Sequence, residues 1–135
     1  MSVPRSKRGV SEAEFLHTAR ELQIFTLRRC KHIPKRYTFL MAKPLSENAA
    51  SVYDMAKRGN SIYPRNQPEA QIRRDYFNHA LAGVYSLVSQ AEVCREMFGI
   101  TTDMMMEWMR LCKQEIELLK GIMDSDRRRY KSLPE

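Results

Sequence analysis

Apolar side chains recur every three or four residues along most of the chain, and this period predicts amphipathic α-helices. No stretch alternates between apolar and polar residues over enough positions to predict a β-strand. Proline, glycine and polar clusters divide the periodic sequence into four stretches, at residues 11–33, 35–58, 68–98 and 101–131. Four helices of roughly 20–30 residues with short connections predict an all-α fold, an antiparallel up-down four-helix bundle.

Residues that favour helix ends flank these stretches. Ser11 and Glu14 have the spacing of a capping box, in which each side chain accepts a hydrogen bond from the other residue's backbone N–H. Gly59–Asn60 and Gly99 follow the second and third stretches, and such residues often end a helix in the left-handed conformation. Pro44 lies inside the second stretch, and because proline lacks an N–H it predicts a kink or a break there.

The third stretch has the most regular apolar stripe of the four. Its members alternate steps of three and four residues: Phe77, Ala80, Val84, Leu87, Ala91, Cys94 and Phe98. A further apolar set lies on the same helix: Tyr76, Leu81, Tyr85 and Val88. Because a second stripe makes the apolar face wider than one bundle covers, it predicts a contact between subunits. We therefore expect a closed cyclic homo-oligomer.

The length of 135 residues suits one domain. We expect the bundle to occupy residues 11–131, between a flexible basic N-terminal tail at residues 1–10 and a C-terminal tail at residues 132–135. No run of about 18 apolar residues occurs, so no membrane-spanning segment is expected. The first residues, MSVPRSKRG, lack the apolar segment of a secretory signal, and a cytoplasmic location is the expectation.

Motifs of catalysis and metal binding are missing from the sequence. It contains no P-loop, no dinucleotide-binding glycine motif, and no zinc-protease or nucleophile-elbow motif. The three cysteines are far apart and lack zinc-ligand spacing to a histidine, so neither a disulfide framework nor a zinc finger is predicted. Glu14 and His17 match half of a di-metal carboxylate pattern that has no second copy. We expect no catalytic residues, no bound metal and no cofactor.

Charge is distributed unevenly along the chain. Lys and Arg number 23 against 16 Asp and Glu, which gives a net charge of +7. Residues 1–74 carry a net charge of +9, from 15 basic and 6 acidic residues, whereas residues 75–126 carry −5 and residues 127–135 carry +3. A basic half and a basic end around an acidic segment favour a polyanionic partner such as nucleic acid.

The densest basic segment spans residues 28–43, inside a stretch, residues 22–46, that has no acidic residue. Its six cations are Arg28, Arg29, Lys31, Lys35, Arg36 and Lys43. His32, Tyr37 and Phe39 are interleaved with them, and an aromatic side chain can stack on an unpaired base. There are two smaller basic groups. One consists of Arg73 and Arg74, and the other of Arg127, Arg128, Arg129 and Lys131. We predict that these residues contact phosphates, without tight sequence preference.

The string Ile33-Pro34-Lys35-Arg36, set between two long helices, and the basic end of the last helix resemble one known family. Over about residues 12–131 the chain is similar to four-helix-bundle proteins related to the accessory variability determinant (Avd) of diversity-generating retroelements. It is similar as well to the small proteins encoded in intervening sequences of 23S ribosomal RNA genes.

The Avd resemblance implies a homopentameric barrel with a positive surface. It further implies that the protein associates with the retroelement reverse transcriptase and with nucleic acid, RNA or cDNA, and is needed for mutagenic retrohoming. Lys35 and Arg36 are the positions that the shared motif carries over as binding candidates. Tyr37 departs from the basic or small residue that follows in the family pattern.

Two hypotheses of different classes result. The first is a non-enzymatic, oligomeric accessory protein that binds nucleic acid and a reverse transcriptase. The second is an interaction bundle of the intervening-sequence type, whose basic face is solvated and has no defined ligand. A bundle that binds a metal or a small molecule is a third alternative, for which the predicted apolar stripes lack inward-facing polar residues.

Overall fold

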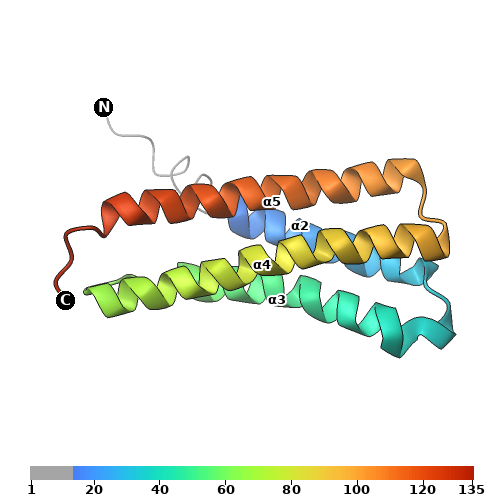
Figure 1. The fold of residues 1–135 in the computed structure, drawn as a ribbon, viewed down its shortest axis with the longest axis horizontal. Coiled ribbons are helices and arrows are strands. Elements are labelled where there is room, and N and C mark those ends of the chain that lie inside the picture. The colour runs from blue at the N-terminus through green and yellow to red at the C-terminus, as the bar shows by residue number, and fades with distance from the viewer. Residues whose placement is uncertain (1–13) are drawn as a thin grey trace.

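The computed structural model describes residues 14–135, which form an elongated bundle of four α-helices (Figure 1). These helices are α2 (Glu14–Arg29), α3 (Lys43–Asn60), α4 (Gln67–Phe98) and α5 (Thr102–Arg129). Each helix packs against the next one in the chain, α5 packs against α2, and neighbours run in opposite directions. The predicted all-α, antiparallel up-down four-helix bundle is confirmed. The expected tail at residues 1–10 and the capping residue Ser11 lie outside the described residues.

One hydrophobic core runs along the centre of the bundle. The predicted stripe of α4 is confirmed, since its six residues from Phe77 to Cys94 are at most 1% exposed. The ring of Phe15 on α2 meets the Phe77 ring edge-on, with 5.5 Å between the ring centres. Trp108 on α5 is fully buried, and its indole N–H donates to the Thr26 hydroxyl at 3.0 Å. Because burying a large apolar side chain contributes about 1.5–3 kcal/mol, these contacts dominate the stability of the bundle.

The second apolar set on α4 is only partly open to solvent. Tyr85 is 47% exposed, whereas Tyr76, Leu81 and Val88 are half-buried. The Lys120 ammonium on α5 lies 5.9 Å from the centre of the Tyr85 ring, so α5 covers one flank of the set. Tyr85 is therefore the member of this set that is most available for a subunit contact.

The end of α3 differs from the predicted glycine cap. Among the described residues only Gly99 has a positive φ, of 66°, so Gly59 and Asn60 do not adopt the left-handed conformation and that prediction is wrong. Gly59 is instead required by packing, because a Cβ there would lie 2.7 Å from Cε1 of Phe77. Gly99 does cap α4 in the left-handed conformation, as predicted.

Side-chain caps define the starts of the last two helices. The Asn66 side chain accepts a hydrogen bond from the Glu69 backbone N–H at 2.9 Å, which begins α4. The Thr101 hydroxyl accepts one from the Met104 backbone N–H at 3.2 Å, which begins α5. Each cap satisfies a backbone N–H that has no partner within the first turn of its helix.

The connection between α2 and α3 is irregular. Two 3-10 turns and one π-helical turn occur there: Cys30–His32, Lys35–Tyr37 and Thr38–Ala42. Of the kink or break predicted at Pro44, the structure has the break, because α3 starts at Lys43 and Pro44 lies in its first turn, where a missing N–H is tolerated. The Lys43 N–H donates to the Thr38 carbonyl, five residues back, which is the spacing of a π-helix. The predicted helix over residues 35–58 is thus an irregular segment followed by α3.

The C-terminal tail, residues 132–135, lies against the start of α4. The Gln67 side-chain amide donates to the carbonyls of Tyr130 and Leu133 at 3.0 and 3.1 Å. The Gln67 backbone N–H donates to the Pro134 carbonyl at 2.8 Å. One residue at the start of α4 therefore fixes the last residues of the chain.

Candidate nucleic-acid interface

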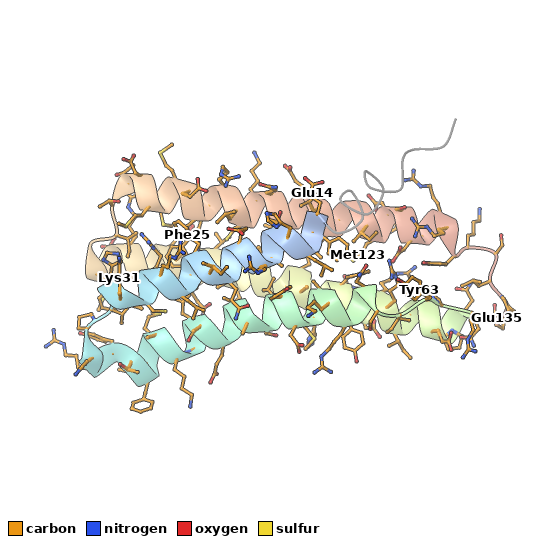
Figure 2. All side chains as sticks on the ribbon, turned by 180° about the vertical axis from the view of Figure 1, so that it is seen from behind. Glu14, Phe25, Lys31, Tyr63, Met123 and Glu135 are labelled. Atoms are coloured by element: carbon orange, nitrogen blue, oxygen red, sulfur yellow. The ribbon has the colours of Figure 1, made fainter. Side chains whose placement is uncertain are left out.

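The basic segment at residues 28–43 forms one end of the bundle, here named the α2–α3 corner. It lies where α2 ends and α3 begins, at the same end of the molecule as the connection between α4 and α5 (Figure 1). Five of its six cations are exposed: Arg28, Lys31, Lys35, Arg36 and Lys43. Figure 2 shows Lys31 at this end. The fold thus gathers the predicted cations of this segment on one corner.

The backbone of the corner is held to the core by Ile33. This residue is extended, with φ −90° and ψ 119°, and it is 9% exposed within the hydrophobic core. Pro34 continues the extended path with φ −58° and ψ 150°, the conformation that a proline and its preceding residue favour. Lys31 and Lys35 flank this anchored pair and remain exposed. The backbone that carries both lysines is therefore held in place by a buried side chain.

Most cations of the corner have no acidic partner among residues 14–135. Lys43 has one, since its ammonium lies 3.9 Å from the Glu47 carboxylate, and an exposed pair of this kind contributes little. Arg29 is half-buried, with its guanidinium carbon 4.6 Å from the centre of the Phe25 ring. Four of the five exposed cations of the corner therefore form no ion pair with a described residue, and exposed cations of this kind can contact phosphates.

The aromatic residues of the corner divide into packed and exposed side chains. The Tyr37 ring is half-buried and lies 5.1 Å from the centre of the Phe98 ring on α4. The Arg36 guanidinium carbon lies over the same ring, 5.2 Å from the centre of the Tyr37 ring. His32 is half-buried as well, whereas Phe39 is 79% exposed. Of the three interleaved aromatic residues, Phe39 is the one that is open to a ligand.

The C-terminal basic group lies at the opposite end of the bundle. Figure 2 shows Lys31 at one end and Glu135 at the other. All four cations of the group are exposed: Arg127, Arg128, Arg129 and Lys131. The Arg127 guanidinium lies 3.9 Å from the Asp124 carboxylate. The 32 residues of α4 span about 48 Å, so this group and the corner are two separate surfaces.

Arg73 belongs to neither surface, and its predicted contact with nucleic acid is wrong. It is 4% exposed, and its guanidinium donates two hydrogen bonds to the Asp126 carboxylate, at 2.6 and 3.2 Å. The same group donates to the carbonyls of Gly59 and Ile62 at 3.2 and 3.0 Å. Arg73 therefore joins α4, α5 and the end of α3 inside the bundle. Arg74 is half-buried, and Nη1 lies 3.5 Å from the Gln71 side-chain oxygen.

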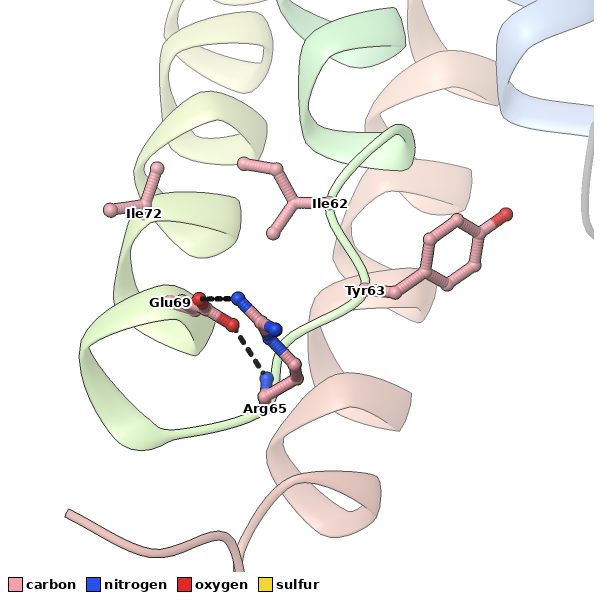
Figure 3. A pocket seen from close by; sticks show the side chains of 5 residues that line it. All are labelled: Ile62, Tyr63, Arg65, Glu69 and Ile72. Atoms are coloured by element: carbon pink, nitrogen blue, oxygen red, sulfur yellow. Dashed lines mark hydrogen bonds and ion pairs between the residues drawn. The ribbon is translucent and has the colours of Figure 1, made fainter.

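A cavity of about 420 Å³ opens beside the connection between α3 and α4 (Figure 3). Its lining residues are Ile62, Tyr63, Arg65, Glu69 and Ile72. The Arg65 backbone N–H donates to one Glu69 carboxylate oxygen at 2.8 Å, and its guanidinium donates to the other at 3.4 Å. These hydrogen bonds lower the pKa of Glu69. The two charged groups of the cavity are therefore engaged with each other.

Metal ligation and thiol chemistry find no support in the described residues. No group of three or more His, Cys, Asp or Glu side chains in residues 14–135 is placed to hold a metal ion. Burial raises the pKa of Cys94 to about 11 and that of Cys112 to about 12, and it raises the pKa of Cys30 as well. All three therefore remain protonated thiols at neutral pH.

Over the same part of the chain, no helix is both long and apolar enough to cross a membrane.

An unpaired carboxyl group lies in the core and corrects the expectation of purely apolar stripes. Glu115 on α5 is 0% exposed, and neither carboxyl oxygen has a hydrogen-bond partner among the described residues. Burial raises its pKa to about 9, so the side chain is protonated at neutral pH. The burial of Glu115 could have been predicted from the helical period, because Glu115 lies in phase with the buried residues Cys112 and Leu119.

Comparisons of the chain with protein-family models, with curated proteins and with solved structures found no match.

Proposed function

We propose that this chain is a non-enzymatic accessory protein that binds nucleic acid at the α2–α3 corner. The supporting observation is the set of five exposed cations, of which only Lys43 has an acidic partner among the described residues. Lys and Arg side chains neutralise phosphates and release condensed counterions, so this surface fits the backbone of RNA or DNA. Because phosphate contacts carry no sequence information, we expect binding without tight sequence preference.

The resemblance of the Ile33–Arg36 motif to Avd-related proteins supplies the biological setting of the proposal. In that setting the protein serves a diversity-generating retroelement and binds its reverse transcriptase in mutagenic retrohoming. It also forms a homopentamer, and we assign the subunit contact to the face of α4 that carries Tyr85, which is 47% exposed. A ring of subunits would repeat the corner and raise avidity without any new contact.

The proposal is tested by fluorescence anisotropy with a single-stranded oligonucleotide over a series of salt concentrations. Each phosphate contact contributes about −0.7 to the slope of log affinity against log salt concentration. The double variant Lys35→Ala/Arg36→Ala should weaken binding and make the slope shallower by about 1.4, because two contacts are lost. The matched control is Arg127→Ala/Arg128→Ala, which removes the same charge at the opposite end and should leave the slope unchanged. All four side chains are exposed, so both variants should fold.

Three results of this experiment would contradict binding at the corner. An unchanged slope in the Lys35/Arg36 variant contradicts the proposal, and a loss in the Arg127/Arg128 variant would assign binding to the C-terminal group. If the wild-type protein does not bind at about 0.1 M salt, the alternative of an intervening-sequence-type bundle without a nucleic-acid ligand replaces it. The retroelement setting is tested separately, by co-purification with a reverse transcriptase encoded beside the gene, and failure to co-purify contradicts it.

A further inference from the structure

Two neighbouring apolar side chains project from the α2–α3 corner. Phe39 is 79% exposed and Leu40 is 74% exposed, and both lie in the π-helical turn Thr38–Ala42. A phenyl ring in water forfeits the free energy that its burial would contribute. Two large apolar side chains that follow each other in the sequence and are both exposed indicate a binding surface more often than a single one does.

The chain on either side of Phe39 is anchored. Tyr37, two residues before, packs on Phe98, and Met41, two residues after, packs against the hydrophobic core. The Lys43 N–H closes the turn with its hydrogen bond to the Thr38 carbonyl. The Phe39 ring is therefore presented on a backbone that is already ordered, and such preorganisation reduces the entropy lost on binding.

The charge around this ring selects a polyanion as its partner. Lys35 and Arg36 precede Phe39 by four and three residues, Lys43 follows it by four, and all three cations are exposed. An exposed aromatic ring also occurs at the other end, where Tyr63 is 80% exposed. There, however, the cation nearest to the ring along the chain, Arg65, is paired with the Glu69 carboxylate, and the exposed cations of that end belong to another segment, residues 127–131. The corner thus combines an open ring with cations that are largely unpaired among the described residues.

We propose that Phe39 stacks on an unpaired base, so that the corner binds single-stranded RNA or DNA in preference to a duplex. This inference rests on the nucleic-acid binding proposed above and adds the form of nucleic acid to it. Every base has a π-face, so stacking is tolerant of sequence, but in a duplex the neighbouring base pairs cover that face. An anionic membrane is less suitable as the partner, because helices that bind lipid surfaces expose an apolar face over several turns, and the corner exposes one turn.

The test compares two oligonucleotides of about 12 nucleotides, one of thymidines and one of abasic sites, which have the same number of phosphates. Wild-type protein should bind the thymidine strand about 5- to 150-fold more tightly, the ratio expected for one stacked base. Phe39→Leu keeps an apolar side chain and removes the aromatic ring, so it should bind both strands equally. Phe39→Tyr keeps the ring and should retain the preference. Both substitutions are at an exposed position, and thermal denaturation should show unchanged stability.

The outcomes separate this inference from the proposal on which it rests. If the wild-type protein binds phosphates without stacking, it should have equal affinity for the two strands and a steep salt dependence. That result overturns the stacking of Phe39 and leaves the proposed phosphate binding intact. A Phe39→Leu protein that still prefers thymidines overturns it as well. The wild-type protein could instead bind neither strand but bind anionic phospholipid vesicles, and the Phe39→Leu protein could fail to bind those vesicles. In that case a lipid surface is the partner and both proposals fail. Under the inference, the salt dependence of Phe39→Leu stays that of the wild-type protein, because the phosphate contacts remain.

Discussion

The replacement of Glu115 by Gln should stabilise the protein, and by an amount that depends on pH. The side chain is fully buried, neither carboxyl oxygen has a partner in the described residues, and its pKa is raised to about 9 by burial. In the unfolded chain the pKa returns to its ordinary value near 4.5. Between these two values the unfolded state loses a proton that the folded state keeps, so a rising pH favours unfolding. The free energy of unfolding is therefore highest, as far as Glu115 determines it, below about pH 4.5. It falls steadily as the pH rises from there to about 9.

The size of the effect follows from the separation of the two pKa values. Each pH unit between them costs about 1.4 kcal/mol, so keeping Glu115 protonated at pH 7 costs about 3 kcal/mol of folding free energy. Glutamine has nearly the same shape and never ionises, and it removes this cost while leaving a buried polar group without a partner. Glu115→Gln should therefore be more stable than the wild-type protein by about 3 kcal/mol at pH 7 and by little at pH 4.5.

Urea denaturation of both proteins at several pH values between 5 and 8 measures the difference directly. Other titrating groups contribute equally to the two proteins and cancel, so the difference should widen by about 4 kcal/mol over this range. Glu117→Gln is the control, because it removes an exposed carboxylate from the same helix and should change the free energy of unfolding by less than about 0.5 kcal/mol. A difference for Glu115→Gln that is constant between pH 5 and pH 8 would refute the reasoning.

Three further outcomes concern packing and assembly. Arg73→Ala leaves the Asp126 carboxylate buried without its partner and should lower the free energy of unfolding by about 3–5 kcal/mol in urea, whereas Arg74→Ala, one residue along, should lower it far less. Gly59→Ala places a methyl group against a buried phenyl ring and should cost about 1–3 kcal/mol, so an unchanged melting temperature would contradict the packing argument. In light scattering at tens of micromolar protein we expect a wild-type oligomer that Tyr85→Arg converts to monomer. A monomeric wild-type protein would disprove the assembly.

The helical period was sufficient to predict α4 and insufficient to predict the start of α3. Phe77 and the stripe that follows it lie in one uninterrupted helix, where phase alone determines burial. Residues 35–42 have a helical period too, since Tyr37 and Met41 are four residues apart. Pro44 cannot donate to the Leu40 carbonyl, and the chain adopts a π-turn whose shape depends on the packing of the corner against α4. That packing joins residues far apart in the sequence, which a local pattern does not specify.

Charge counts along the chain could not distinguish Arg73 from the cations of the corner, although its helical phase could. Arg73 lies four residues before Phe77, on the buried stripe of α4, and its partner Asp126 lies on the buried stripe of α5. Phase thus predicts that a charged residue is inside the bundle, but only the fold shows whether a partner faces it, as for Arg73, or no partner does, as for Glu115. The two cases have opposite consequences. Removing Arg73 leaves the Asp126 carboxylate buried without its partner and destabilises the core, whereas replacing Glu115 by a group that never ionises removes the cost of keeping its carboxyl group protonated. Five of the six cations of the corner are exposed outside the buried stripes, and of these five only Lys43 has an acidic partner among the described residues.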